Sequence, residues 1–117
     1  EEDHPLTNLT EKSGMQTFYF PNNVSYFDKY NVFKGGVTNK EIASWKTTYL
    51  RMLKQISLYR GKNKRLLLKN PNNTGRIKVL LELFPNAKFI FIHRNPYEVY
   101  RSTNHLYNSA IRNVWLQ

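Results

Sequence analysis

Residues 65–104 read RLLLKNPNNTGRIKVLLELFPNAKFIFIHRNPYEVYRSTN, and the fold prediction rests on this segment. Two short apolar runs, 65–69 and 87–92, flank a segment whose apolar residues recur at helical spacing, 77–84. Short continuous apolar runs between polar turns are typical of strands that are covered on both faces. We therefore predict a strand–helix–strand unit with two parallel strands, a right-handed crossover, and Thr74 as the helix cap.

A further helix is predicted directly after the second strand. Asn95 is a favoured N-cap residue, and Pro96 suits the first helical position, where its missing N–H costs nothing. Glu98 follows the cap at the spacing of a capping box. We expect this helix to run through Tyr107 and to continue as far as Trp115.

The first half of the chain contains one clear helix, predicted over 39–60. Thr38 and Glu41 are spaced as a capping box, apolar residues recur at helical spacing behind them, and Gly61 is a suitable C-terminal stop. Residues 1–38 keep no such period. We expect loops, short helical turns and aromatic anchors there.

Length, composition and charge narrow the function classes. The 117 residues correspond to one domain at most, and the absence of Cys excludes disulfides and thiolate metal sites. The chain shows neither a signal peptide nor a transmembrane stretch, so we expect a cytoplasmic protein. Of the net charge of +10, residues 59–117 carry +9, from 11 Lys/Arg and two acids. Such a charge attracts nucleic acids and small phosphorylated or sulfated molecules alike.

A candidate anion site follows from the predicted topology. Arg94 lies between the carboxyl end of a parallel strand and a helix N-terminus, where open α/β sheets bind ligands. Its guanidinium can grip a phosphate through two hydrogen bonds, and Ser102 could add a hydroxyl donor. Lys69 ends the neighbouring strand, so pairing of the two strands would bring it to the same edge.

These residues resemble the core of a sulfotransferase that uses 3′-phosphoadenosine 5′-phosphosulfate. Arg94-Asn95-Pro96 followed by Ser102 is similar to the 3′-phosphate motif of that family, and Lys69-Asn70-Pro71 is similar to its Lys-x-Pro element. The resemblance implies transfer of a sulfuryl group to a hydroxyl or amine acceptor, leaving adenosine 3′,5′-bisphosphate, without a metal. It implies that Arg94 and Ser102 hold the 3′-phosphate, and that Lys69 contacts the donor and stabilises the transferring group.

The sequence departs from the family pattern in two places. The family's loop for the 5′-phosphosulfate is missing, and Gly35–Lys40, which has similar letters, is better explained as a loop and a helix cap. Asn73 stands where many members have a histidine that could act as the base. The acidic opening resembles an acidic segment of related members, which makes Glu2 the candidate base. His93 and His105 are weaker candidates, because strand alternation points His93 away from Arg94.

The predicted fold class is α/β, with a P-loop-like parallel sheet core and flanking helices that is incomplete in this chain. Two strands do not make a stable sheet, so we expect residues 1–117 to be the central part of one sulfotransferase domain. The acceptor stays open among a polysaccharide, a lipid, a small metabolite and a protein tyrosine. The alternatives are a basic module that binds nucleic acid or another polyanion without catalysis, and a nucleotide kinase-like fragment, which would lack its Walker lysine loop.

Overall fold

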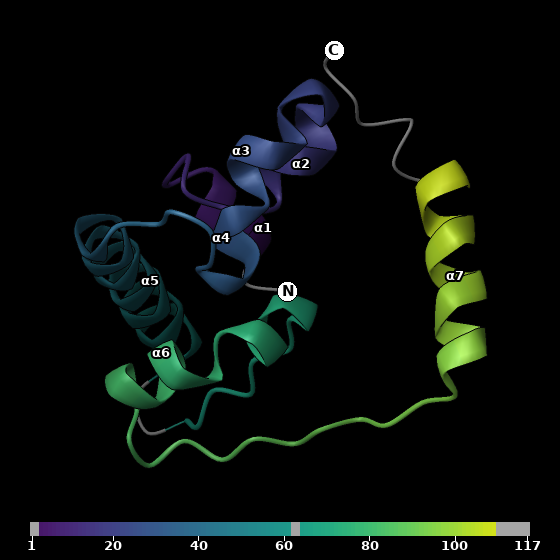
Figure 1. Cartoon of the computed structure of the whole chain (residues 1–117). Helices are drawn as coiled ribbons and strands as arrows, with labels where there is room; N and C mark the ends of the chain where they lie inside the picture. The colour runs from purple at the N-terminus through teal and green to yellow at the C-terminus, as the bar shows by residue number, and fades with distance from the viewer. Residues whose placement is uncertain (1–2, 62–63, 110–117) are drawn as a thin grey trace.

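The computed structural model describes residues 3–61 and 64–109, and the secondary structure there is helical (Figure 1). The elements follow in the order α1 (Asp3–Thr7), α2 (Gln16–Tyr19), the 3-10 helix η1 (Pro21–Asn23), α3 (Val24–Phe27), α4 (Lys29–Val32), α5 (Asn39–Arg60), the 3-10 helix η2 (Pro71–Gly75), α6 (Ile77–Leu83) and α7 (Pro96–Ser109).

The long helix α5 confirms the prediction for 39–60. Thr38 Oγ1 accepts the Glu41 N–H at 3.2 Å, and the Glu41 carboxylate accepts the Thr38 N–H at 2.7 Å. Gly61 ends the helix with φ +95°, a conformation that favours glycine. These local interactions satisfy the free backbone groups at the ends of α5, so its apolar face determines where it packs.

The core is built on that apolar face. Trp45 and Tyr49 of α5 are fully buried, and their rings stack with centroids 4.6 Å apart. Leu6 of α1 and Leu80 of α6 pack into the same cluster. The short helices expected in residues 1–38 are confirmed as α1 to α4, and Tyr30 of α4 is a buried aromatic anchor.

Helix α6 begins differently from the prediction. Thr74 does not cap it, because a 3-10 turn continues through Gly75 and Arg76 takes the N-cap position without a side-chain cap. The Arg76 side chain points inward instead and is 0% exposed. The prediction of Thr74 as the cap was therefore wrong, because Thr74 lies inside the 3-10 helix η2.

The two predicted strands, 65–69 and 87–92, are not paired in the described part of the chain. Both segments are extended: in 65–69 Leu66 and Leu68 are partly buried against the core and Leu67 is 88% exposed, whereas in 87–92 the apolar side chains are largely exposed, with Ile90 at 83%. An extended backbone satisfies its N–H and C=O groups only through a neighbouring strand or water. The parallel sheet therefore stays a prediction.

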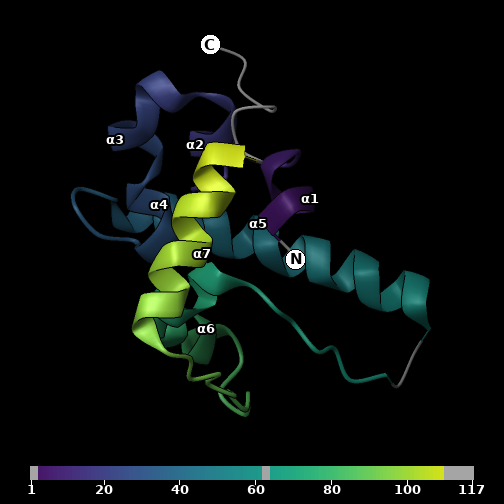
Figure 2. The same ribbon diagram turned by 90° about the vertical axis from the view of Figure 1, so that its right-hand side faces the viewer.

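Helix α7 stands apart from α5 and α6 (Figure 1), and it meets the rest of the described molecule at an aromatic contact between Tyr107 and Phe18 of α2. The extended chain after α6 leads across to it, and Figure 1 shows α7 separated from α5 and α6. Figure 2, turned by 90°, shows the extended chain that follows α5 returning toward η2. We call α1 to α6 with their connections, residues 3–84, the body, and residues 85–109 the C-terminal arm.

Candidate functional site

Arg94 lies two residues before the start of α7, as the sequence predicts, whereas the parallel strand expected before it stays a prediction. Asn95 caps the helix, because its Oδ1 accepts the Tyr97 N–H at 3.0 Å, and Pro96 is the first helical residue. The predicted helix start is thus confirmed. Its remaining free N–H groups and the positive end of the helix dipole adjoin the exposed Arg94 side chain.

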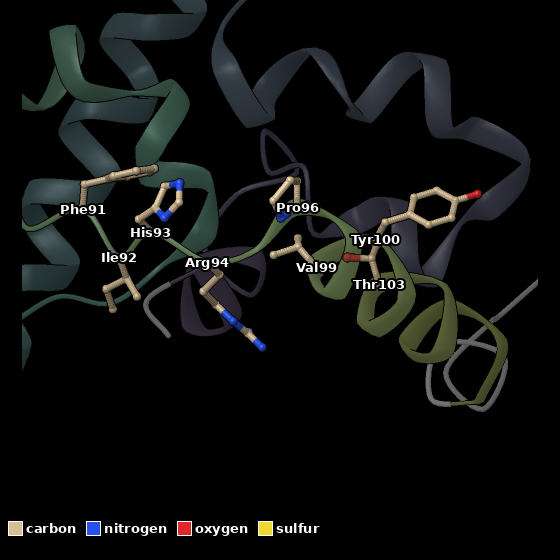
Figure 3. A pocket seen from close by; sticks show the side chains of 8 residues that line it. All are labelled: Phe91, Ile92, His93, Arg94, Pro96, Val99, Tyr100 and Thr103. Atoms are coloured by element: carbon tan, nitrogen blue, oxygen red, sulfur yellow. The ribbon is translucent and has the colours of Figure 1, made fainter.

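A shallow hollow of about 510 Å³ surrounds this helix start (Figure 3). Figure 3 shows Phe91 and His93 pointing to one side of the extended chain and Ile92 and Arg94 to the other, as strand alternation predicts. The lining is mostly apolar, with Arg94 as its permanently charged member; it consists of Phe91, Ile92, His93, Arg94, Pro96, Val99, Tyr100 and Thr103. Arg94 thus places a permanent positive charge beside an exposed apolar surface.

Ser102 is not part of that lining. It lies on α7 and is exposed, whereas its neighbour Thr103 lines the hollow together with Arg94. Thr103 offers the same hydroxyl chemistry, and reasoning from the motif overlooked it because the motif names only the residue before it. His105, the histidine of α7, is also exposed and outside the hollow.

Lys69 lies in the extended chain directly before the turn at Asn70 and is exposed. It is absent from the lining of the hollow around Arg94. Lys69 and Arg94 do not share a hollow because segments 65–69 and 87–92 are not paired. Only hydrogen bonds between the two segments, as in a parallel sheet, would bring both strand ends to the same edge. The convergence of Lys69 and Arg94 stays a prediction.

The candidate base, Glu2, lies outside the described residues. Its neighbour Asp3 is 1% exposed and forms an ion pair with Arg76, whose Nη1 donates to Asp3 Oδ1 at 2.8 Å and to Oδ2 at 3.1 Å. Asn72 Nδ2 donates to Asp3 Oδ2 at 2.8 Å. We call Asp3, Asn72 and Arg76 the Arg76 clamp.

The Arg76 guanidinium is enclosed on every side by named partners. Its Nε donates to the Asn31 carbonyl and its Nη2 to the Tyr30 carbonyl, both at 3.0 Å. Its Cζ lies 5.4 Å from the ring centroid of Phe33 and 5.1 Å from that of Trp45. The planar fork of arginine suits this combination of a carboxylate, two carbonyls and two ring faces.

The clamp fixes the ionisation of Asp3. Burial opposes the charged form of this carboxyl, but the charge of Arg76 and the hydrogen bonds from Arg76 and Asn72 outweigh it, so the pKa of Asp3 is lowered. A buried, ionised and fully engaged carboxylate is a poor proton acceptor for a substrate. Asp3 is therefore a structural neighbour of the candidate base and does not replace it.

Sequence reasoning missed the Arg76 clamp. Arg76 looks like an ordinary basic residue at the start of an amphipathic helix, and Asp3 is 73 positions away from it. One signal was present: a glycine precedes Arg76, and a Cβ at Gly75 would lie 2.2 Å from Val32 Cγ1, so η2 packs closely on α4. The glycine is visible in the sequence, but the close contact between η2 and α4 that requires it is known only from the structure.

Other classes of site find little support in the described ranges. Across 3–61 and 64–109 no group of three or more His, Asp or Glu side chains is arranged to hold a metal ion. None of the helices in these ranges is both long and apolar enough to cross a bilayer; α5 has the length, with 22 residues, but it is strongly polar.

Comparisons with known proteins agree with the family resemblance that the two sequence motifs indicate. A model of the sulfotransferase family matches residues 13–116. The chain is 44% identical over 101 residues to the omega-hydroxy-beta-dihydromenaquinone-9 sulfotransferase Stf3 of Mycobacterium bovis, and equally to the protein of that name from Mycobacterium tuberculosis. Each alignment covers 86% of the chain but 25% of the relative, so the chain spans about a quarter of these proteins' length. No solved structure matches the chain significantly.

Proposed function

Because the chain belongs to the sulfotransferase family, we propose that the whole protein transfers a sulfuryl group from 3′-phosphoadenosine 5′-phosphosulfate to a hydroxyl group of an acceptor. The observation that carries this proposal is the family match, which spans both the Lys69 turn and the Arg94 helix start. That match favours sulfuryl transfer over the nucleic-acid-binding alternative, for which the described residues offer only positive charge.

Arg94 is the proposed anchor for the 3′-phosphate of the donor. Its exposed guanidinium, the capped start of α7 and the hydroxyl of Thr103 support an anion at this position, and Ser102 is a second hydroxyl donor on the same helix. The apolar lining around Phe91 and Tyr100 suits the purine or the ribose face. Arg94 and the helix would thereby orient the donor without taking part in bond breaking.

The transfer itself requires a cation and a base. The acceptor oxygen forms a bond to sulfur while the bond from sulfur to the bridging phosphate oxygen breaks, and the acceptor proton passes to the base. We assign Lys69 to the charge that develops on the leaving phosphate, and Glu2 to the proton. The contact between Asp3 and Asn72 supports this pairing, because it joins the neighbour of Glu2 to the turn that follows Lys69.

The acceptor hydroxyl is proposed to belong to an apolar molecule. The two mycobacterial relatives are named for an omega-hydroxyl of a dihydromenaquinone, and this makes an isoprenoid alcohol the first acceptor to test. The exposed aromatic and aliphatic side chains near Arg94 agree with an apolar acceptor as well as with the nucleotide.

Calorimetric titration with adenosine 3′,5′-bisphosphate tests the donor site, with AMP as the ligand control. We expect the bisphosphate to bind the whole protein at least ten times more tightly than AMP. Arg94→Ala should weaken its binding by about 1.5–3 kcal/mol, the range of a charge-assisted hydrogen bond. Arg101→Ala, which removes an exposed arginine of α7 that does not line the hollow, should leave binding within twofold.

Turnover is measured separately, with radiolabelled donor and farnesol as the isoprenoid alcohol. Sulfated farnesol and one equivalent of adenosine 3′,5′-bisphosphate should appear together. Equal affinity for AMP and the bisphosphate would contradict the role of Arg94, whereas intact donor after prolonged incubation with a panel of alcohols would contradict sulfuryl transfer.

A further inference from the structure

We propose that the Arg76 clamp positions the turn that carries Lys69, so that Asp3 and Arg76 act as positioning residues in sulfuryl transfer. The inference rests on the proposed function and goes beyond it, because it assigns a role in turnover to residues that touch neither donor nor acceptor. It also predicts how the acidic start of the chain and the Lys69 turn are kept together.

The turn after Lys69 is tied to itself by its own asparagines. Asn70 Oδ1 accepts the Asn72 N–H at 3.1 Å, and the Asn70 carbonyl accepts the Asn73 N–H at 3.1 Å. Pro71 fixes the backbone at the first position of η2. The turn is therefore a compact, internally hydrogen-bonded unit, and Lys69 directly precedes it in the chain.

The clamp anchors this unit from outside. The side chain of Asn72 donates to Asp3, and the backbone N–H of Arg76 donates to the Asn73 carbonyl at 3.1 Å. The Arg76 guanidinium then ties the end of the turn to α1 through Asp3 and to the carbonyls of α4. Asp3 reaches the turn both directly and through Arg76, so its carboxylate sets the orientation as well as the distance.

Stability alone is a weak explanation for this arrangement. A buried ion pair stabilises a protein no better than well-packed apolar residues of similar volume. What the pair adds is direction, because each hydrogen bond requires a particular geometry of both partners. Directional contacts next to a proposed catalytic lysine matter for transfer, since a misplacement of about 1 Å can slow an enzyme by about a hundredfold.

The test is made in the whole protein and exchanges the directional ion pair of the clamp for apolar side chains that can only pack. The double variant Asp3→Leu/Arg76→Met removes both charges together at similar volume, so we expect it to fold, with a thermal midpoint lowered by the loss of the hydrogen bonds to the Tyr30 and Asn31 carbonyls. Asn72→Ala is the milder variant, which cuts the tie from Asp3 to the turn and leaves the ion pair intact. The control Lys46→Met/Glu82→Leu removes an exposed ion pair between α5 and α6, away from the turn.

Three quantities are measured for each variant: the thermal midpoint, the affinity for adenosine 3′,5′-bisphosphate, and kcat and KM with the radiolabelled donor and farnesol. The clamp variants should bind the bisphosphate within twofold of the wild type but turn over at least about tenfold more slowly, with the loss in kcat. The control pair should keep wild-type kcat. Arg76→Lys, which keeps the charge and loses the fork, should fall between the double variant and the wild type.

The outcomes separate the two proposals. Folded clamp variants with wild-type kcat would overturn the positioning role and leave sulfuryl transfer intact. A loss of kcat that follows the thermal midpoint equally in the control pair would also overturn it, because it would show a purely structural effect. A wild-type protein that transfers no sulfuryl group would overturn the proposed function, and the role of the clamp with it.

Discussion

The body and the C-terminal arm use apolar residues in opposite ways. In the body, the core side chains Leu6, Trp45 and Leu80 are at most 5% exposed. In the arm, Ile90, Phe91 and Ile92 are 76% to 83% exposed, and α7 buries none of its residues. The two regions have similar apolar content, so the difference lies in what covers it.

The difference follows from where the backbone hydrogen bonds are made. The core of the body is built by helices, whose bonds are local, and each helix needs only one apolar face against its neighbours. The body also contains the extended segment 65–69, where Leu66 and Leu68 pack against that core and Leu67 is exposed. The arm begins with an extended run whose apolar side chains 90–92 are all exposed, and such a run is stable only with strands beside it. The arm therefore requires a partner that the described residues do not provide.

The largest effect is expected where the body buries a charge. Arg76→Met leaves the Asp3 carboxylate buried without its cation, and we expect the free energy of unfolding to fall by about 3–5 kcal/mol. Urea unfolding at neutral pH measures this loss. Arg101→Met on the exposed face of α7 is the matched control and should change stability by less than about 0.5 kcal/mol. Equal losses of unfolding free energy in both variants would show that the buried arginine of the body contributes no more to stability than an exposed arginine of the arm.

A second pair of variants tests whether the arm gains a covering sheet. Leu80→Ala should destabilise the body by about 2–5 kcal/mol, because it opens a cavity in the core. Ile90→Ala should cost less than about 0.5 kcal/mol in the arrangement described here, since Ile90 is 83% exposed. The parallel sheet that the sequence predicts would instead bury Ile90. A loss in the whole protein close to that of Leu80→Ala would therefore establish the sheet.

The sequence predicted correctly those helix ends that are set by interactions between neighbouring residues. The start and end of α5 and the start of α7 follow from residues within one turn of each other, Thr38 with Glu41 and Asn95 with Tyr97. These elements were predicted correctly. The cap at Thr74 failed because a competing turn, held by Asn70 and by contacts across the fold, extends the 3-10 helix past it.

The same distinction between local and long-range causes applies to the residues of the candidate site. Arg94 could be named as a candidate because its signal, an apolar run followed by a capped helix, is contiguous, and its role as a phosphate anchor stays a prediction. The Arg76 clamp could not, because no local pattern distinguishes an arginine that will be buried against Asp3, 73 positions away, from one that faces solvent. The sheet prediction depends on strands that the described residues do not pair, and so it awaits the Ile90 measurement.

Acid sensitivity should come from the body alone. Hydrogen bonds from Tyr30 and Thr38 lower the pKa of Glu41 to about 2, so its folded form holds protons less tightly than its unfolded form. The resulting stabilisation is complete above the ordinary pKa of 4.5 and is lost as the pH falls toward 2. Unfolding by urea between pH 6 and pH 2 should show this decline, and Glu41→Gln should reduce it, leaving the part that comes from the lowered pKa of Asp3. An unchanged slope in Glu41→Gln would place the acid sensitivity elsewhere, with Asp3 as the next candidate.

The smallest expected effect concerns the contact that joins the arm to the body. Phe18 of α2 and Tyr107 of α7 meet edge to face, with ring centroids 6.2 Å apart. A double-mutant cycle with Phe18→Leu and Tyr107→Leu should give a coupling energy of about 0.5–1.5 kcal/mol, the range for such aromatic pairs. Phe20 and Tyr107, from the same two regions, serve as the comparison pair and should show no coupling. A coupling near zero for Phe18 and Tyr107 would mean that the arm docks elsewhere in solution, and the exposed face of Ile90 would then be the first place to look for its partner.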